Sequence, residues 1–114
     1  MRALVTGSRW WTDCRSVFHA LDERRDQITH IIHGGSRGVD RCAKRWAYHN
    51  RLPESEFLPN YRAYGSKAAP LMRNQRMIDE GRPDLIIAFP GGNGTADMIG
   101  RAQRARIPVL RIVF

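Results

Sequence analysis

Cysteine is scarce in this sequence: its 114 residues include only Cys14 and Cys42, which do not have the spacing of metal ligands. We therefore expect two reduced thiols in a cytoplasmic protein. The sequence also lacks an apolar run as long as a membrane span, and its N-terminus lacks the layout of a secretory signal peptide. These absences predict a cytoplasmic protein without a membrane partner.

Several catalytic and organisational signatures are absent as well. There is no internal repeat, linker or low-complexity segment, no G-x-S-x-G turn, no Walker-type lysine and no His/Cys/Asp cluster with metal spacing. The composition suits a globular protein, because 42% of the residues are hydrophobic. We predict a single domain over residues 1–114, with no metal and no cofactor.

Acidic residues are few. The sequence has 11 Asp and Glu residues and 19 Lys and Arg residues, which gives a formal net charge of +8. Such a surface attracts phosphates, whether in a small nucleotide or along a nucleic acid. The arginines are spread through all the predicted helices, so the charge favours an anionic partner without specifying which one.

Apolar runs alternate with helical patterns along the chain. Strands are predicted near residues 2–6, 28–33, 56–58, 84–89 and 109–113, and helices near 13–25, 38–50, 66–80 and 93–105. For the third helix, a plain amphipathic pattern with Leu71 and Ile78 facing inward is the alternative to a ligand-binding role. This alternation predicts an α/β, three-layer Rossmann-like sandwich with a mostly parallel five-stranded sheet in the order 3-2-1-4-5. Ligands of such folds bind beyond the carboxyl ends of the strands.

Three predicted strand-to-helix turns are rich in glycine: "TGSRWWTD", "HGGSRGVD" and "PGGNGTAD". Glycine lets backbone N–H groups approach a ligand, and a helix start adds unpaired donors, so each turn is a candidate anion cradle. Packing is the alternative reason for any one of these glycines. The ligand-binding candidates, including those of the third helix, are Gly7, Ser8, Arg9, Trp10, Gly34, Gly35, Ser36, Asp40, Lys67, Arg73, Asn74, Pro90, Gly91, Gly92, Gly94 and Thr95.

Two carboxylates fall just inside predicted helices, Asp40 and Asp97. Acidic residues there stabilise the helix dipole, and the alternatives are contact with a ribose hydroxyl or acid–base work. His33 ends a strand and is either a catalytic group or a buried histidine beneath the loop. If the protein is an enzyme, the catalytic candidates are Arg73, Asp97 and Asp40.

The turn "PGGNGT" resembles the PGGxGT signature of the SLOG superfamily of Rossmann-like domains, which includes the lonely-guy phosphoribohydrolases and DNA-processing protein A. With "VTGSRWWTD", "HGGSRGVDRCAKRWA", "GSKAAPLMRNQRM" and "AFPGGNGTADMI", the sequence is most similar to the YspA-like branch. The resemblance implies a pocket for a nucleotide or a nucleotide-derived ligand. An association with phage, plasmid or bacterial defence systems also fits this branch.

Lonely-guy enzymes use an arginine and a glutamate to hydrolyse a nucleoside monophosphate. The resemblance matches their arginine to Arg73, but Met98 stands at the glutamate position, and a thioether cannot act as an acid or a base. Asp97 is adjacent and points about 100° away on a helix. We therefore expect a protein that binds its ligand without turning it over, for instance an ADP-ribose-like molecule.

The alternatives are a nucleotide N-glycosidase and, with less support, single-stranded DNA binding, since no compact basic stripe with interleaved aromatic residues is present. Self-association is also expected, because a small domain often completes its pocket with a neighbour. Replacing Gly92 with a bulky residue is expected to abolish ligand binding and leave the fold largely intact.

Overall fold

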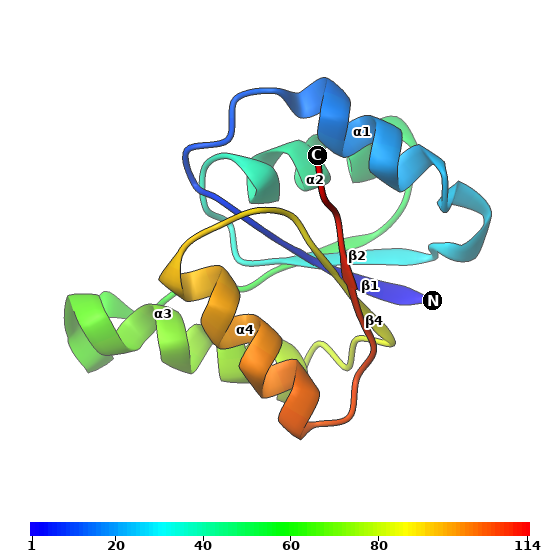
Figure 1. Cartoon of the computed structure of the whole chain (residues 1–114). Helices are drawn as coiled ribbons and strands as arrows, with labels where there is room; N and C mark the ends of the chain where they lie inside the picture. Colours follow the sequence, from blue (N-terminus) through cyan, green and yellow to red (C-terminus); the bar gives the residue numbers. More distant parts are fainter.

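A sheet of five parallel strands runs through the centre of the protein, for which the computed structural model describes residues 1–114 (Figure 1). The strands are β1 (Arg2–Thr6), β2 (His30–His33), β3 (Glu54–Glu56), β4 (Leu85–Ala88) and β5 (Val109–Arg111). The helices are α1 (Cys14–Asp22), α2 (Val39–His49), α3 (Tyr61–Asp79) and α4 (Asn93–Arg104), with a short 3₁₀ helix at Arg25–Gln27.

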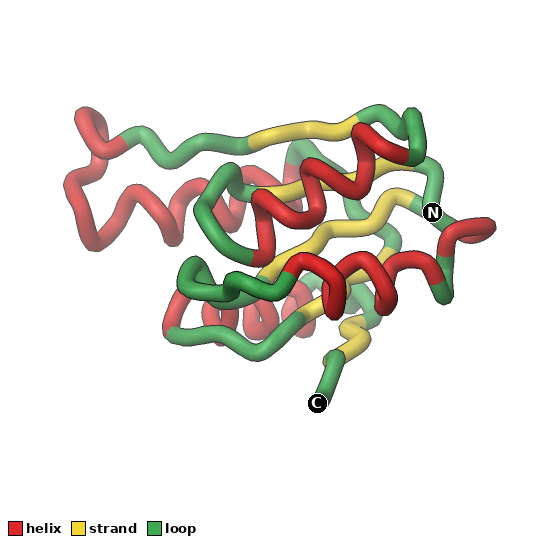
Figure 2. Tube along the Cα trace, turned by 90° about the horizontal axis from the view of Figure 1, so that it is seen from above, coloured by secondary structure: helices red, strands yellow, loops and turns green.

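The strand order is β3-β2-β1-β4-β5, and all four neighbouring pairs are parallel. Figure 2 shows the strands side by side, with β5 and the C-terminus at one edge. The predicted α/β Rossmann-like sandwich and its strand order are therefore confirmed. The third strand was predicted two residues too late, because its polar sequence Glu54-Ser55-Glu56 gives no apolar signal at this edge of the sheet.

Two apolar cores cover the two faces of the sheet. Ala3 and Val5 of β1 point into a core shared with α1 and α2, whereas Leu4 points into a core shared with α3 and α4. This alternation follows from the two-residue period of a strand. In Figure 1, α1 and α2 lie on one side of the sheet and α3 and α4 on the other. Both faces of the sheet are therefore covered, which is why the inner residues of the central strands β1, β2 and β4 are apolar.

Helix α3 begins five residues before the predicted start. The side chain of Asn60 caps it by accepting a hydrogen bond from the Ala63 N–H at 3.0 Å. Gly65 interrupts the helix with φ +78° and ψ 177°. The segment before this break, residues 61–65, is exposed and extends beyond the rest of the fold in Figure 1. Ile78 is buried, as a plain amphipathic helix requires, but Leu71 does not face inward, since that residue is 37% exposed.

The prediction of two reduced thiols was wrong, because Cys14 and Cys42 form a disulfide bond. Cys14 is the first residue of α1, and Cys42 lies in the first part of α2 on its buried face. The two helices pack beside each other on the same face of the sheet, which brings the Cα atoms to 5.2 Å. The number and spacing of cysteines carry no information about this proximity.

None of the helices combines the length and the apolar composition that a membrane crossing requires. No group of three or more His, Cys, Asp or Glu side chains is placed to hold a metal ion.

Candidate functional site

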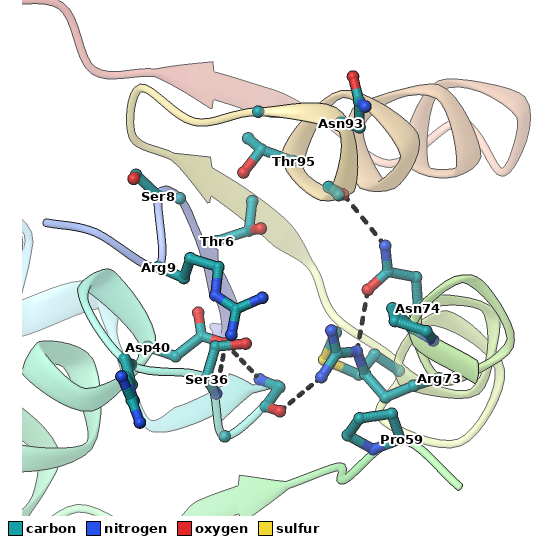
Figure 3. A pocket seen from close by; sticks show the side chains of 18 of the residues that line it. Thr6, Ser8, Arg9, Ser36, Asp40, Pro59, Arg73, Asn74, Asn93 and Thr95 are labelled. Carbon is teal, nitrogen blue, oxygen red and sulfur yellow. Dashed lines mark hydrogen bonds between the residues drawn. The ribbon is translucent and has the colours of Figure 1, made fainter. Parts of the chain in front are cut away.

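Three loops at the carboxyl ends of β1, β2 and β4 surround a cavity of about 740 Å³ (Figure 3). We call them loop 1 (residues 7–13), loop 2 (residues 34–38) and loop 3 (residues 89–92). The wall opposite loop 1 and loop 2 is formed by α3 and the segment before it. The volume is within the range of small-molecule and cofactor sites. The cavity lies where the strand order reverses around β1, which is the position expected for a ligand in this architecture.

Most of the predicted site residues are brought together here. Those that line the cavity are Gly7, Ser8, Arg9, Trp10, Gly34, Gly35, Ser36, Asp40, Lys67, Arg73, Asn74, Gly92, Gly94 and Thr95. Three predicted residues do not line it, namely Pro90, Gly91 and Asp97. His33 is fully buried beneath loop 2, and Met98 is fully buried in the core between the sheet and α3 and α4.

The glycines of loop 1, loop 3 and the start of α4 differ in whether packing accounts for the missing side chain. A Cβ on Gly91 would collide with Thr95 Oγ1, and a Cβ on Gly7 would lie 2.6 Å from Val39 Cγ2. Packing is thus a sufficient reason for these two. In contrast, a Cβ on Gly92 or Gly94 would have no atom within 4 Å, and neither residue has a positive φ. Nothing in the fold requires glycine at positions 92 and 94, and both line the cavity.

Helix α4 starts at the cavity without a side-chain cap. Gly92 occupies its N-cap position, and no side chain caps the helix by accepting from its first N–H groups. The first N–H groups of a helix have no partner within the helix, and the helix dipole places partial positive charge there. Thr95 is buried in this turn, and Asn74 of α3 donates to the Gly94 carbonyl at 3.1 Å. The start of α4 is therefore a fixed set of donors that faces the cavity.

The first three backbone donors of loop 2 are used within the protein. Asp40 Oδ2 accepts hydrogen bonds from the N–H groups of Gly34 at 3.1 Å and Ser36 at 3.2 Å. The Gly35 N–H donates to His33 Nδ1 at 3.1 Å, and Nε2 of the same ring hydrogen-bonds to Glu54. Because a backbone N–H is always a donor, the His33 proton is on Nε2. The N–H groups of Gly34, Gly35 and Ser36 are therefore satisfied by the protein, unlike the donors at the start of α4.

The carboxyl group of Asp40 has competing influences on its pKa. Burial raises the pKa above the ordinary value, since the residue is only 6% exposed. The hydrogen bond from Ser36, the electrostatic influence of His33 and of the Arg73 guanidinium, and the hydrogen bond from Gly34 all lower the pKa. Asp40 thus holds loop 2 in place as an acceptor at the cavity wall.

Arg73 connects α3 to loop 2. Its Nη1 donates to the Gly34 carbonyl at 2.5 Å, and its Nε donates to Asn74 Oδ1 at 3.1 Å (Figure 3). Burial lowers the pKa of Arg73, and Asp40 acts against that shift. An arginine remains charged in proteins, so the guanidinium brings a fixed positive charge to the cavity.

Asp97 belongs to a network next to the cavity. Its Oδ2 accepts from Arg101 Nε at 2.7 Å and from Asn74 Nδ2 at 3.0 Å, and its side chain is 20% exposed. Asp97 therefore holds Asn74, which in turn contacts Arg73 and Gly94.

Asp97→Asn is expected to lower the free energy of unfolding by about 1–2 kcal/mol, because it removes the charge from a half-buried network of hydrogen bonds. Urea denaturation of both proteins measures the difference. An unchanged free energy of unfolding would show that the network does not contribute to stability.

The cavity lining carries net positive charge. Five basic side chains line it, Arg9, Arg37, Arg41, Lys67 and Arg73, against the single carboxyl group of Asp40. A concave site of one dominant sign attracts a ligand of the opposite sign.

Sequence reasoning missed the wall that follows β3. Leu58, Pro59 and Tyr61 line the cavity together with Pro70 and Leu71 of α3. The signal was present, because these first three residues follow a strand of the same parallel sheet and so emerge at the same edge. Trp10 is 72% exposed at the cavity, whereas Trp11 packs near Phe89 with ring centroids 6.4 Å apart.

Comparisons with known proteins show the family and the fold of this chain. Residues 1–64 match the model of the YspA, cpYpsA-related SLOG family. The Gene 61 protein of Mycobacterium phage D29 is 37% identical over 118 residues, which cover 96% of this chain and 94% of that protein. The X-ray structure of TM1055 superposes with a TM-score of 0.72 at 17% identity, over 95% of this chain and 71% of that one. This last similarity shows a shared fold.

Proposed function

This chain belongs to the YspA, cpYpsA-related SLOG family, and we propose that it binds a nucleotide or a nucleotide-derived small molecule in the cavity at the carboxyl ends of its strands. Residues 1–114 act in this proposal as one nucleotide-binding domain. The ligand is a nucleoside phosphate or an ADP-ribose-like molecule. The protein serves as a sensor of such a signal or sequesters it.

The observation that carries the proposal is the pair of glycines at the start of α4. Packing explains Gly7 and Gly91, but no contact or backbone angle explains Gly92 and Gly94. Both line the cavity at an uncapped helix start, where backbone N–H groups and the helix dipole favour an anion. A bare backbone at this point lets a phosphate reach those donors. The positive lining of the cavity supports the same ligand class.

Binding without turnover is favoured over hydrolysis by the side chains near this helix. Met98 is fully buried, so it does not reach the cavity. Asp97 is engaged by Arg101 and Asn74 and does not line the cavity. Asp40 lines it, but one of its oxygens holds loop 2. An N-glycosidase activity would have to depend on Arg73 and the remaining oxygen of Asp40.

Mass spectrometry tests the proposal. The protein is incubated with a nucleotide extract of cells, purified, and denatured to release its ligand, with the extract alone as the control. We expect an intact nucleotide or ADP-ribose derivative in one-to-one amount. Free base and ribose phosphate that accumulate with time would establish a hydrolase instead. If no small molecule is released, binding of nucleotides is wrong and single-stranded DNA becomes the ligand to test.

The proposed location is the cytoplasm, where nucleotide pools are available. Disulfides are rare in that compartment, so both the bonded and the reduced protein are to be assayed. The phage relative is compatible with a role in phage biology or in bacterial defence.

The proposal includes self-association. Large apolar side chains are exposed at the cavity or next to it on the same segment, namely Leu58, Tyr61, Tyr64, Leu71 and Met72. Exposed apolar residues gathered in one region are typical of protein interfaces. Light scattering after size-exclusion chromatography gives the subunit number, and a monomer mass at all concentrations would remove this part of the proposal.

A further inference from the structure

One oxygen of Asp40 has no hydrogen-bond partner in the protein. Both bonds from loop 2 go to Oδ2, and no donor reaches Oδ1. No buried side-chain nitrogen or oxygen lacks a partner anywhere in the protein, so Oδ1 is not enclosed. Because Asp40 is only 6% exposed and lines the cavity, the open side of Oδ1 is the cavity itself. A largely buried carboxylate thus presents a free acceptor to a ligand.

Arg73 presents the matching donor. Its Nη1 and Nε are occupied by Gly34, Phe57 and Asn74, while Nη2 donates to no protein atom. No buried side-chain nitrogen of the protein lacks a hydrogen-bond partner, so Nη2 is not enclosed. Because Arg73 lines the cavity, the open side of Nη2 is the cavity. Arg73 and Asp40 hold the two polar groups of the same residue, the carbonyl and the N–H of Gly34. No ion pair joins them, so each keeps its free atom for another group.

A free acceptor and a free donor, on two side chains that are both hydrogen-bonded to Gly34, select one kind of ligand group. A hydroxyl can donate to a carboxylate and accept from a guanidinium at the same time. A phosphate at this point would meet the negative charge of Asp40, and an ammonium group would meet the positive charge of Arg73. The N–H groups of Gly34, Gly35 and Ser36 offer no alternative place for the phosphate, because Asp40 and His33 already accept hydrogen bonds from them.

We propose that Asp40 Oδ1 and Arg73 Nη2 bind a sugar hydroxyl of the ligand, which makes Asp40 the residue that selects a ribose over a deoxygenated sugar. This inference rests on the proposed function and specifies the orientation of the bound ligand in the cavity. Its phosphate lies at the start of α4, and its sugar hydroxyls lie against Gly34 between Asp40 and Arg73. The ligand class is accordingly a phosphorylated ribose derivative.

Calorimetry with two probes tests the inference. The probes are adenosine monophosphate and its 2′,3′-dideoxy analogue, which differ only in the sugar hydroxyls. Hydrogen bonds to charged groups correspond to roughly a tenfold to 100-fold change in affinity. We expect the full-length protein to bind adenosine monophosphate at least about tenfold more tightly than the dideoxy analogue. This comparison requires no variant.

The variant Asp40→Asn separates the proposed contact of Asp40 with the ligand from its hydrogen bonds to loop 2. The asparagine Oδ1 can still accept from Gly34 and Ser36, whereas its amide N–H₂ replaces the free carboxylate oxygen. We expect the preference for the ribose compound to fall to within about threefold. Asp79→Asn is the matched control, an exposed carboxyl at the far end of α3, and should keep the full preference. Inosine monophosphate is a third probe, which differs from adenosine monophosphate only in the base and so detects a contact of Asp40 with the edge of the base.

The outcomes distinguish this inference from the proposed function. If the two probes bind equally well to the unmodified protein, or if Asp40→Asn keeps the preference, the inference is overturned while nucleotide binding stands. If Asp40→Asn instead changes the ratio between adenosine and inosine monophosphate, the pair recognises a base edge, and the sugar assignment is wrong. If neither sugar probe binds, the inference is overturned, and the release experiment decides separately on the proposed function.

Discussion

Gly94→Gln is expected to weaken nucleotide binding roughly 10- to 100-fold and, at the same time, to raise the free energy of unfolding by about 0.5–1 kcal/mol. The two effects have opposite signs because Gly94 serves the ligand and not the fold. It lies inside the first turn of α4 with nothing within 4 Å of a Cβ position, so a side chain has room. Glutamine also has a much better helix propensity than glycine.

The loss of binding follows from where that side chain would project. Gly94 lines the cavity at the uncapped start of the helix, so a glutamine there occupies the space through which an anion reaches the backbone donors. Each hydrogen bond to a charged group that is lost weakens binding by about tenfold or more. The same reasoning applies to Gly92, whose replacement with a bulky residue remains a prediction.

Gly100→Gln is the matched control for this variant. Gly100 lies in the same helix outside the cavity, and a Cβ there would meet only the flexible end of Arg104, at 3.4 Å. We expect it to gain similar stability and to keep full affinity. Urea denaturation and calorimetry with adenosine monophosphate measure the two quantities. Full affinity in Gly94→Gln would mean that the start of α4 does not bind the phosphate, and the proposed function would lose its main support.

Reduction of the Cys14–Cys42 disulfide is expected to lower the free energy of unfolding by about 2–4 kcal/mol. The bond joins residues 28 positions apart, so it restricts the unfolded chain, and its removal returns that conformational freedom. In the folded protein it connects the first residue of α1, directly after loop 1, to the first part of α2. The Val39 N–H at the start of α2 also donates to the Ser8 carbonyl at 3.1 Å, so loop 1 stays attached at one further point.

Denaturant unfolding with and without a thiol reductant measures this contribution. A variant with both cysteines replaced by alanine is the control, because reductant should not change its stability. The unfolded protein, denatured without reductant, should contain no thiol that reacts with an aromatic disulfide reagent. Two reactive thiols in that assay would contradict the bond, and the original expectation of reduced cysteines would stand.

Much of the fold could be predicted from the sequence, because secondary structure depends on the pattern of residues that are close together in the chain. A continuous apolar run, as in Ala3-Leu4-Val5, reflects a strand covered on both faces, and strands separated by helical patterns reflect parallel pairing. Once the strands are parallel, every strand-to-helix turn emerges at one edge of the sheet. The glycine-rich turns and their positions around the cavity could therefore be predicted from local patterns alone.

The function of individual polar residues was decided only by the tertiary structure. Asp40 and Asp97 look alike in the sequence, yet one lines the cavity and the other is held by Arg101 and Asn74 beside it. Gly91 and Gly94 also look alike, and only the position of Thr95 Oγ1 separates a packing glycine from one that faces open space.

These differences arise from contacts between distant segments of the chain. The bond from Arg73 to Gly34 spans 39 residues, that from Asn74 to Asp97 spans 23, and the disulfide spans 28. Local patterns determine which face of a strand or helix is apolar, because they depend on the repeat of the backbone. The partner of a polar side chain depends on how whole elements pack, and so the sequence by itself determined the sheet and its loops, while packing decided which loop donors remain free for a ligand.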